Sequence, residues 1–194
     1  GIRGFGVFLA ACQTLSRRSG GSAELPSRLA GERHPATPGP IRDSPRLLSW
    51  QHPKRTVAAA VNVCATEGAE IWVRAGAYSG ASVDLPAFCY LYGGFMGSEI
   101  TKDERQPAIN VTTLANHYII VRGGSGFRTI DGFTIEKGRV SCYYSSPVIS
   151  NNRFLGCGQS LYCYSSSASI VDNVIESSKY GAIECSYGTP RILR

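Results

Sequence analysis

Four side chains in the second half of the chain have types and spacing suited to binding a sugar: Tyr143, Tyr162, Tyr164 and Glu184. A tyrosine ring packs against the apolar face of a sugar, while a carboxylate accepts hydrogen bonds from sugar hydroxyls. Tyrosine is also common on exposed strands, where paired rings stabilise a sheet by about 0.2 to 1 kcal/mol. The set predicts a carbohydrate-contacting surface, with sheet stabilisation as the alternative, if the fold brings all four onto one face.

The elements that would position these residues come from a repeated phrase. Similar copies of it occupy residues 141–154, 162–175 and, in shortened form, 184–193. Cys142, Cys163 and Cys185 mark equivalent positions, 21 and then 22 residues apart. Repetition at a fixed period indicates stacked structural units, and a period of about 20 residues is too short for two helices or a propeller blade. It fits one coil of a parallel β-helix.

Alternation within each copy predicts which side chains point inward. Leu161 and Cys163 alternate with Tyr162 and Tyr164, and successive residues of a strand face opposite sides of the sheet. We therefore expect the three equivalent cysteines to form one interior column of buried thiols. The tyrosines and Glu184 are expected on the outside.

Two asparagines, Asn152 and Asn173, fall at the corner between the second and third strands of successive coils. Stacked amides can hydrogen-bond along the solenoid and satisfy backbone groups that a buried turn leaves unpaired. Phe133 takes the equivalent position in the preceding coil. The asparagine stack is therefore expected to begin at Asn152.

These motifs resemble those of bacterial right-handed parallel β-helix repeat proteins of the pectate-lyase-like superfamily. The resemblance runs from Thr56 to the end of the chain and rests on EIWVRAGAYSG, YLYGGFMGSE, TIDGFTIEKG and the repeated S-P-x-I-x-N-N pattern. It implies an all-β fold, a right-handed parallel β-helix with coils of about 20 residues. It also implies an exported repeat module, structural and carbohydrate-contacting.

The same resemblance suggests an alternative, because catalytic members of the superfamily are polysaccharide lyases or glycoside hydrolases that act on acidic polysaccharides. Elimination needs a base and a cation, and hydrolysis needs two carboxylates that flank one bond. The side chains available for these roles are Asp131, Glu136, Asp172, Glu176, Glu184, Lys137, Arg139, Arg153 and Lys179. Glu136 and Glu176 are expected in one column, about 9.6 Å apart at two coil spacings. No aspartate cluster is visible, so no catalytic residue is assigned.

Charge divides the chain into two parts. Residues 1–55 carry nine Lys and Arg against three Asp and Glu, whereas residues 56–194 carry eleven of each. Residues 1–53 are rich in Pro, Gly, Ser and Arg, which predicts a disordered basic segment, with an arm that binds acidic polysaccharide or membrane as the alternative. Residues 54–194 are predicted to form the solenoid domain, whose balanced charge argues against a nucleic-acid partner.

Each end of the solenoid carries its own prediction. Residues 54–68 predict an amphipathic capping helix of about three turns, with Thr56 as its N-cap and Gly68 as its stop. Such a helix would cover the open edge of the first coil. The chain begins without Met and stops at Arg194 inside an expected strand, so we expect a fragment of a longer protein, truncated at its C-terminus.

Localisation and cofactors are predicted from weaker signals. Residues 9–12, Leu-Ala-Ala-Cys, resemble the lipobox of bacterial lipoproteins, which suggests the remnant of an export signal with a lipid anchor at Cys12; a chance apolar patch is the alternative. Together with the family resemblance, this indicates a secreted or cell-surface protein, and no apolar stretch approaches the roughly 18 residues that cross a bilayer. The three histidines are scattered and no CxxC pair occurs, so no metal and no cofactor are expected.

Overall fold

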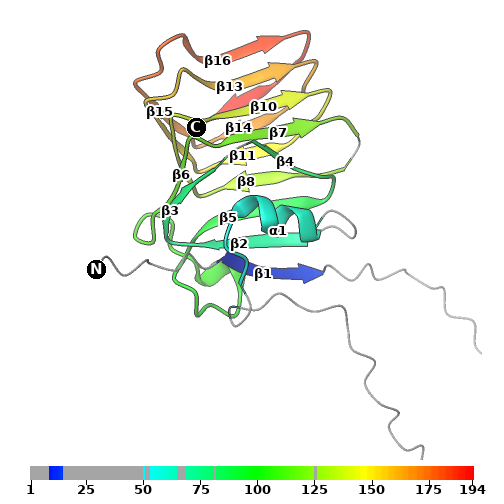
Figure 1. Ribbon diagram of the computed structural model, residues 1–194. Helices are drawn as coiled ribbons and strands as arrows, with labels where there is room; N and C mark the ends of the chain where they lie inside the picture. The colour runs from blue at the N-terminus through cyan, green and yellow to red at the C-terminus, as the bar shows by residue number, and fades with distance from the viewer. Residues whose placement is uncertain (1–8, 15–49, 51–52, 65–68, 81, 125) are drawn as a thin grey trace, which may run out of the picture.

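The computed structural model describes residues 9–14, 50, 53–64, 69–80, 82–124 and 126–194. They form a parallel β-solenoid of about six turns with coils of about 21 residues. In Figure 1 the strands are stacked one above another, from β1 and β2 at the bottom to β16 at the top. The predicted fold class is confirmed. Most of residues 1–53 lie outside the described part, so disorder there stays a prediction.

Apart from β1, the strands form three parallel sheets. The first sheet has the order β1 (Leu9–Thr14), β2 (Ala69–Arg74), β5 (Cys89–Phe95), β8 (Thr129–Asp131), β11 (Val148–Ser150), β14 (Ser169–Val171) and β17 (Arg191–Leu193). The second sheet stacks β3 (Gly76–Ser79), β6 (Thr112–Ala115), β9 (Thr134–Glu136), β12 (Arg153–Leu155) and β15 (Val174–Glu176). The third sheet stacks β4 (Val83–Asp84), β7 (Tyr118–Arg122), β10 (Arg139–Tyr143), β13 (Gln159–Tyr164) and β16 (Gly181–Ser186).

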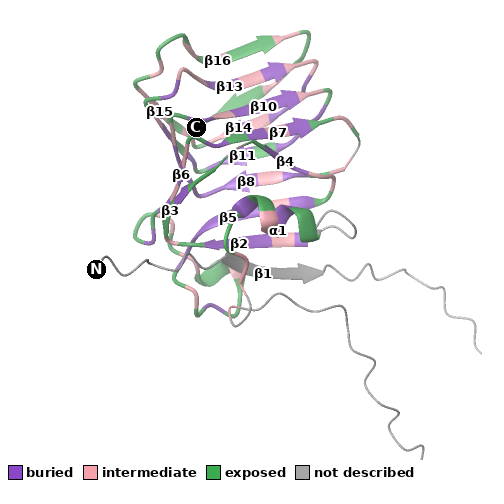
Figure 2. Ribbon diagram, in the orientation of Figure 1, coloured by how far each residue is buried: buried purple, intermediate pink, exposed green. Residues whose placement is uncertain are grey.

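The core lies inside the coils, in columns of stacked side chains. Val140 pairs with Leu161, and Leu161 pairs with Ile183, as the repeat predicted. Large buried side chains from all three sheets fill the same interior, including those of Phe95, Leu114, Ile130, Ile149 and Phe154. Full burial of such a side chain stabilises a fold by about 1.5 to 3 kcal/mol. Figure 2 shows this burial in the middle coils and a largely exposed β16.

The cysteine column is present, but one expectation about it is wrong. Cys142 pairs with Cys163, Cys163 pairs with Cys185, and all three are free thiols. Cys142 and Cys163 are buried, whereas Cys185 is exposed, because it belongs to the last described coil and no described residue stacks on it. The Cys142 thiol is hydrogen-bonded to Cys163 and buried. Both effects raise the pKa of Cys142 well above the usual value, so this thiol stays protonated.

The asparagine ladder is confirmed at the corner between the first and second sheets. Asn152 Oδ1 accepts a hydrogen bond from the Phe133 N–H at 3.1 Å, and Asn173 Oδ1 accepts one from the Asn152 N–H at 3.0 Å. Asn152 Nδ2 donates to the Ile130 carbonyl at 2.9 Å and to Asn173 Oδ1 at 3.1 Å. Each amide thus satisfies backbone groups of the preceding coil.

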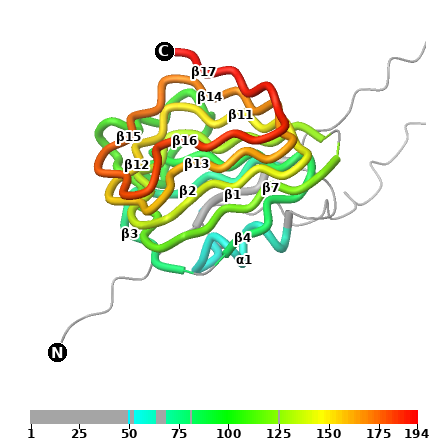
Figure 3. The backbone as a smooth tube through the Cα atoms, turned by 90° about the horizontal axis from the view of Figure 1, so that it is seen from above, coloured from blue at the N-terminus to red at the C-terminus, as the bar shows by residue number. Residues whose placement is uncertain are grey.

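Two elements lie at the N-terminal end of the solenoid. Helix α1 (Val57–Cys64) has eight residues, fewer than the three turns predicted, and its predicted N-cap is confirmed: Thr56 Oγ1 accepts from the Ala59 N–H at 3.1 Å. No sequence pattern predicted β1, which pairs antiparallel with β2 and takes the edge of the first sheet. The helix contacts β1, β2 and β4, and Figure 3 shows it beside β4 at the margin of the solenoid. Together α1 and β1 cover the first coil.

A long connection between β5 and β6, residues 96–111, contains the 3₁₀ helix η1 (Lys102–Glu104). Its first turn is organised by the buried carboxylate of Glu99, which accepts hydrogen bonds from the N–H groups of Met96, Gly97 and Ser98. Burial raises the pKa of Glu99, but these backbone bonds outweigh it and leave the pKa below the ordinary value. The connection is therefore held in one place against the first sheet.

Candidate functional site

The four predicted sugar-binding residues lie together on the outer side of the third sheet. Tyr143 pairs with Tyr164 across β10 and β13, and Tyr162 pairs with Glu184 across β13 and β16. The tyrosines are half-buried and Glu184 is exposed, while their strand neighbours Leu161 and Cys163 are buried. The alternation read from the sequence therefore placed them on one face.

Ring contacts join these tyrosines to two others that the sequence reasoning missed. Tyr143 and Tyr162 have ring centroids 5.7 Å apart, Tyr144 and Tyr164 are 5.5 Å apart, and Tyr164 and Tyr187 are 5.4 Å apart. Tyr144 and Tyr187 are 63% and 84% exposed. These five residues are called the tyrosine face below.

Tyr144 and Tyr187 sit at the corner that follows the strand, in the left-handed backbone region, with φ of 52° and 56°. Ser165 occupies the same corner in the coil between them, with φ of 47°. This conformation is uncommon for a bulky residue and costs about 1 to 2 kcal/mol relative to ordinary backbone. The signal available in the sequence was the aromatic residue directly after each strand, at equivalent positions of two coils.

A row of polar side chains crosses the tyrosine face. Arg139 Nη1 donates to Gln159 Oε1 at 3.1 Å, and Gln159 Nε2 donates to Glu184 Oε2. The Arg139 guanidinium lies 5.9 Å from the ring centroid of Tyr118 and 6.0 Å from that of Tyr162. Desolvation and the Glu184 charge raise the pKa of Tyr162, so its phenol is a neutral hydrogen-bond donor at ordinary pH. The face thus offers rings, donors and an acceptor side by side.

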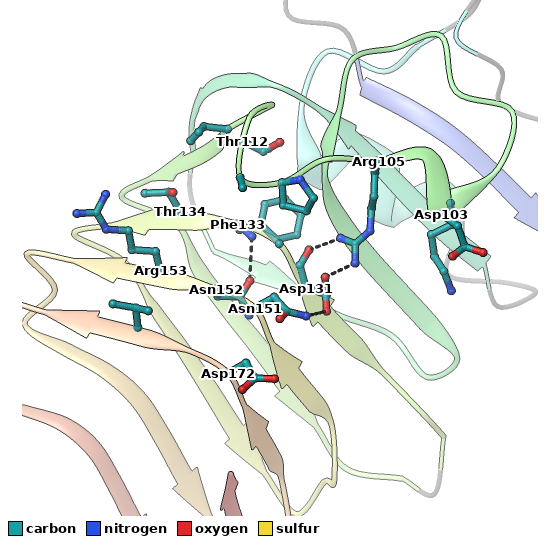
Figure 4. Close-up of a pocket in the computed structure, with 16 residues that line it drawn as sticks. Asp103, Arg105, Thr112, Asp131, Phe133, Thr134, Asn151, Asn152, Arg153 and Asp172 are labelled. Atoms are coloured by element: carbon teal, nitrogen blue, oxygen red, sulfur yellow. Dashed lines mark hydrogen bonds and ion pairs between the residues drawn. The ribbon is translucent and has the colours of Figure 1, made fainter. Parts of the chain in front are cut away.

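A second concave site lies at the corner of the first and second sheets, where residues of the long connection form one wall. It encloses about 770 Å³. Figure 4 shows Asp103 and Arg105 on the connection, opposite Asp131, Asn151 and Asp172 on the solenoid. We call this site the groove. Asp103, Asp172 and Arg153 are exposed there, whereas Asp131 and Asn152 are buried.

An ion pair between Arg105 and Asp131 ties the connection to the solenoid. Arg105 Nη2 contacts Asp131 Oδ1, and Arg105 Nη1 donates to the Gly93 carbonyl at 3.1 Å. The other oxygen of Asp131 accepts hydrogen bonds from Ser150 Oγ and from Asn151 Nδ2, the latter at 2.8 Å. Because both oxygens of this buried carboxylate are engaged, its role in the structure is to hold the groove wall.

The remaining candidate acids do not gather in one place. Glu136 and Glu176 flank Leu155 in one column of the second sheet, as predicted. Arg153 donates to Glu176 at 2.8 Å and lowers the pKa of that carboxyl. Glu184 belongs to the third sheet. Across the described ranges, no group of three or more His, Cys, Asp or Glu side chains could hold a metal ion.

Comparisons with known proteins found no match for the chain. No protein-family model matches it, and neither a curated protein nor a solved structure does. What is established is thus the class of fold, a parallel β-solenoid of repeated coils. Among its described helices none is long and apolar enough to cross a membrane. Cys12 lies in β1 opposite Ile71, and lipid attachment there stays a prediction.

Proposed function

We propose that this chain is a solenoid module that binds carbohydrate through the tyrosine face. The observation that carries the proposal is the unbroken series of ring contacts from Tyr144 through Tyr164 to Tyr187, on an exposed face that also carries Glu184. Rings of this kind expose apolar area next to hydroxyl groups. Sugars present the complementary combination of apolar C–H faces and hydroxyls.

The strands that carry the rings support this proposal. Tyr143, Tyr162 and Tyr164 project from paired strands whose inner side is packed into the core. A tyrosine has two side-chain torsions, so little conformational entropy is lost when a ring already supported by neighbours accepts a ligand. A preorganised surface binds more tightly than a mobile one with the same contacts.

Stabilisation of the sheet alone is the competing role for these rings. A ring that serves only to stabilise its neighbours gains most when it is covered. Tyr187 is 84% exposed and Tyr144 is 63% exposed, and both occupy a backbone conformation that is costly for tyrosine. Their exposure and conformation favour a ligand as the reason for their presence.

The family and the localisation of the module are inferred from the resemblance noted in the sequence. We infer that the module belongs among the bacterial β-helix repeat proteins of the pectate-lyase-like superfamily and is secreted or held at the cell surface. The repeated coils and the asparagine ladder support this assignment. A polysaccharide or a cell-surface glycan is then the expected partner.

Retention on polysaccharide gels tests the proposal directly. Tyr164→Ala removes the ring that contacts both Tyr144 and Tyr187, and we expect it to lower the affinity for a retained glycan about tenfold. Phe127→Ala is the matched control, because Phe127 is 70% exposed and precedes β8 in the first sheet. Equal retention of the two variants, or no retention of the unmodified protein on a broad panel, would contradict the proposal.

A second candidate function is cleavage of an acidic polysaccharide in the groove, as a lyase or a glycoside hydrolase. The exposed carboxylates of Asp103 and Asp172, beside Arg153, favour it. Cleavage releases reducing ends or unsaturated products that absorb ultraviolet light, and Asp172→Asn should then abolish product release. Retention without products leaves carbohydrate binding as the function.

A further inference from the structure

A small pocket borders the tyrosine face at the start of β10 and β13. It has a volume of about 270 Å³ and is lined by Tyr118, Lys137, Gly138, Arg139, Gly158, Gln159 and Tyr180. Two of these residues are cations and none is an acid. The ammonium of Lys179 lies 4.8 Å from the ring centroid of Tyr180, at the edge of the same pocket. The pocket therefore has a positive character that the balanced charge of the whole solenoid hides.

Arg139 has hydrogen-bonding capacity left over. A guanidinium carries five N–H donors, and the structure gives that of Arg139 one side-chain partner, Gln159 Oε1 at 3.1 Å. Its Nε is the one buried side-chain nitrogen or oxygen of the described residues that has no hydrogen-bond partner. No described carboxylate forms a salt bridge with Arg139 or Lys137, unlike Arg105, Arg122 and Arg153. An anion entering the pocket would approach two cations that no described carboxylate neutralises through a salt bridge.

Two glycines, Gly138 and Gly158, line the pocket. A Cβ at Gly138 would lie 2.3 Å from the His117 carbonyl oxygen, so no side chain fits there. Gly158 faces the ring of Tyr180, where an added Cβ would lie 3.5 Å from Cδ2. The rings of Tyr118 and Tyr180 line the pocket together with Lys137 and Arg139. This arrangement can hold a ring that bears one charged substituent.

We propose that this pocket is the anion subsite of the glycan-binding surface and takes the carboxylate or sulfate group of an acidic sugar. This inference rests on the proposed function. Arg139 connects the two, because the same guanidinium that faces the pocket lies 6.0 Å from the ring centroid of Tyr162 on the tyrosine face. Charge-assisted hydrogen bonds from arginine are roughly twice as strong as neutral ones. The subsite thus selects charged sugars, while the tyrosine face supplies contacts that any sugar can make.

Three small sugars that differ in one group test the subsite. Methyl β-D-glucuronide carries a carboxylate, methyl β-D-glucoside 6-sulfate carries a sulfate ester, and methyl β-D-glucoside carries neither. Titrations followed by the N–H signal of Arg139 Nε should show binding of the charged sugars at least about tenfold tighter than that of the glucoside. Comparison of the two charged sugars identifies which anion the subsite prefers. Added salt should weaken that preference.

Variants separate the subsite from general positive charge. Lys137→Asn removes a cation at an exposed position with φ of 50°, which asparagine tolerates, so the fold is retained. Lys137→Asn should reduce the preference for charged sugars severalfold. Arg139→Gln should abolish that preference almost completely. Arg122→Gln is the matched control, because this exposed arginine lies over Tyr143 and pairs with Asp84 outside the pocket. It should leave the preference unchanged.

Two outcomes would overturn the inference. Equal affinity for the glucoside and the charged sugars contradicts it, and so does an equal loss of preference in Arg122→Gln and Lys137→Asn. Either result leaves the proposed function standing if Tyr164→Ala still weakens retention on a neutral polysaccharide. A different result would be no retention on any gel while the charged sugars still bind. It would contradict carbohydrate binding by the tyrosine face and show that the pocket binds small anions only.

Discussion

The groove and the tyrosine face are built from the same coils but use their polar side chains in opposite ways. In the groove, Asp131 is bound by Arg105, Ser150 and Asn151, and the asparagine ladder follows directly behind it. On the tyrosine face, the rings contact one another and Glu184 has a single side-chain donor, Gln159. One corner of each coil is thus fastened by internal polar contacts. The outer side of the third sheet instead carries Glu184, which is exposed.

This difference shows that one side of a repeated coil can stabilise the fold while another side carries the residues that contact a ligand. Buried polar groups must be paired, because an unpaired one costs about 1 to 3 kcal/mol. The asparagine and aspartate positions meet that requirement and hold the coils in register. On the outer side of the third sheet the tyrosines are half-buried and Glu184 is exposed, so side chains there are available to a ligand.

Asp131→Ala should produce the largest change in stability. It leaves the guanidinium of Arg105 without its carboxylate at a site where the two side chains are 16% and 8% exposed. Loss of one partner of a buried pair destabilises a protein by about 3 to 5 kcal/mol, and urea unfolding measures this. Asp84→Ala is the control, because it breaks an exposed pair with Arg122 and should cost less than about 1 kcal/mol. Similar losses for both variants would show that the groove is not fastened by this pair.

Asn152→Leu should destabilise the solenoid by about 1 to 3 kcal/mol, since the Phe133 N–H and the Ile130 carbonyl lose their partner. Asn173→Leu should cost less because Asn173 is only half-buried. Thermal melts of the two variants give the comparison. Unchanged melting of both would mean that the ladder contributes nothing to the register of the coils.

Acid should loosen the first turn of the long connection. The folded-state pKa of Glu99 lies below its ordinary value, so its stabilising effect is present above the unfolded pKa and is lost as pH falls through the folded pKa. Protection of the Gly97 and Ser98 amide protons against exchange, taken relative to the intrinsic exchange rate at each pH, should therefore fall at acid pH. In Glu99→Gln this acid step should be absent. A step of the same size in that variant would assign it to another group.

Tyr187→Ala should have the smallest effect on stability, within about 0.5 kcal/mol, because the residue is exposed and has one ring contact. Its effect on ligand retention should be larger, about threefold. Denaturation and gel retention on the same preparation separate the two quantities. A variant with full retention would place the ligand away from this end of the face.

Much of the fold could be predicted from the sequence because the coil repeats. The spacing of Cys142, Cys163 and Cys185 defined the period, and alternation around Leu161 and Tyr162 assigned inside and outside. Each copy of a repeat supplies independent evidence for the same register. The interior columns and the asparagine ladder followed from that redundancy.

The parts outside the repeat could not be predicted in this way. Strand β1 pairs antiparallel with β2, and its residues carry no alternating pattern that marks this edge. The groove depends on the contact between Arg105 and Asp131, which are 26 residues apart and occur once. Likewise, Tyr118, Arg139 and Tyr180 come from different coils and line one pocket only when the coils are stacked. Long-range contacts that occur once leave no period in a sequence.

The most direct measurement follows backbone amide signals while a retained glycan is titrated into the protein. Carbohydrate binding by the tyrosine face predicts that the largest shifts fall on Tyr143, Tyr162, Tyr164 and their neighbours in β10, β13 and β16. The amides around Asp131 and Asp172 in the groove should remain unchanged. Shifts confined to the groove, or shifts spread evenly over the solenoid, would contradict it.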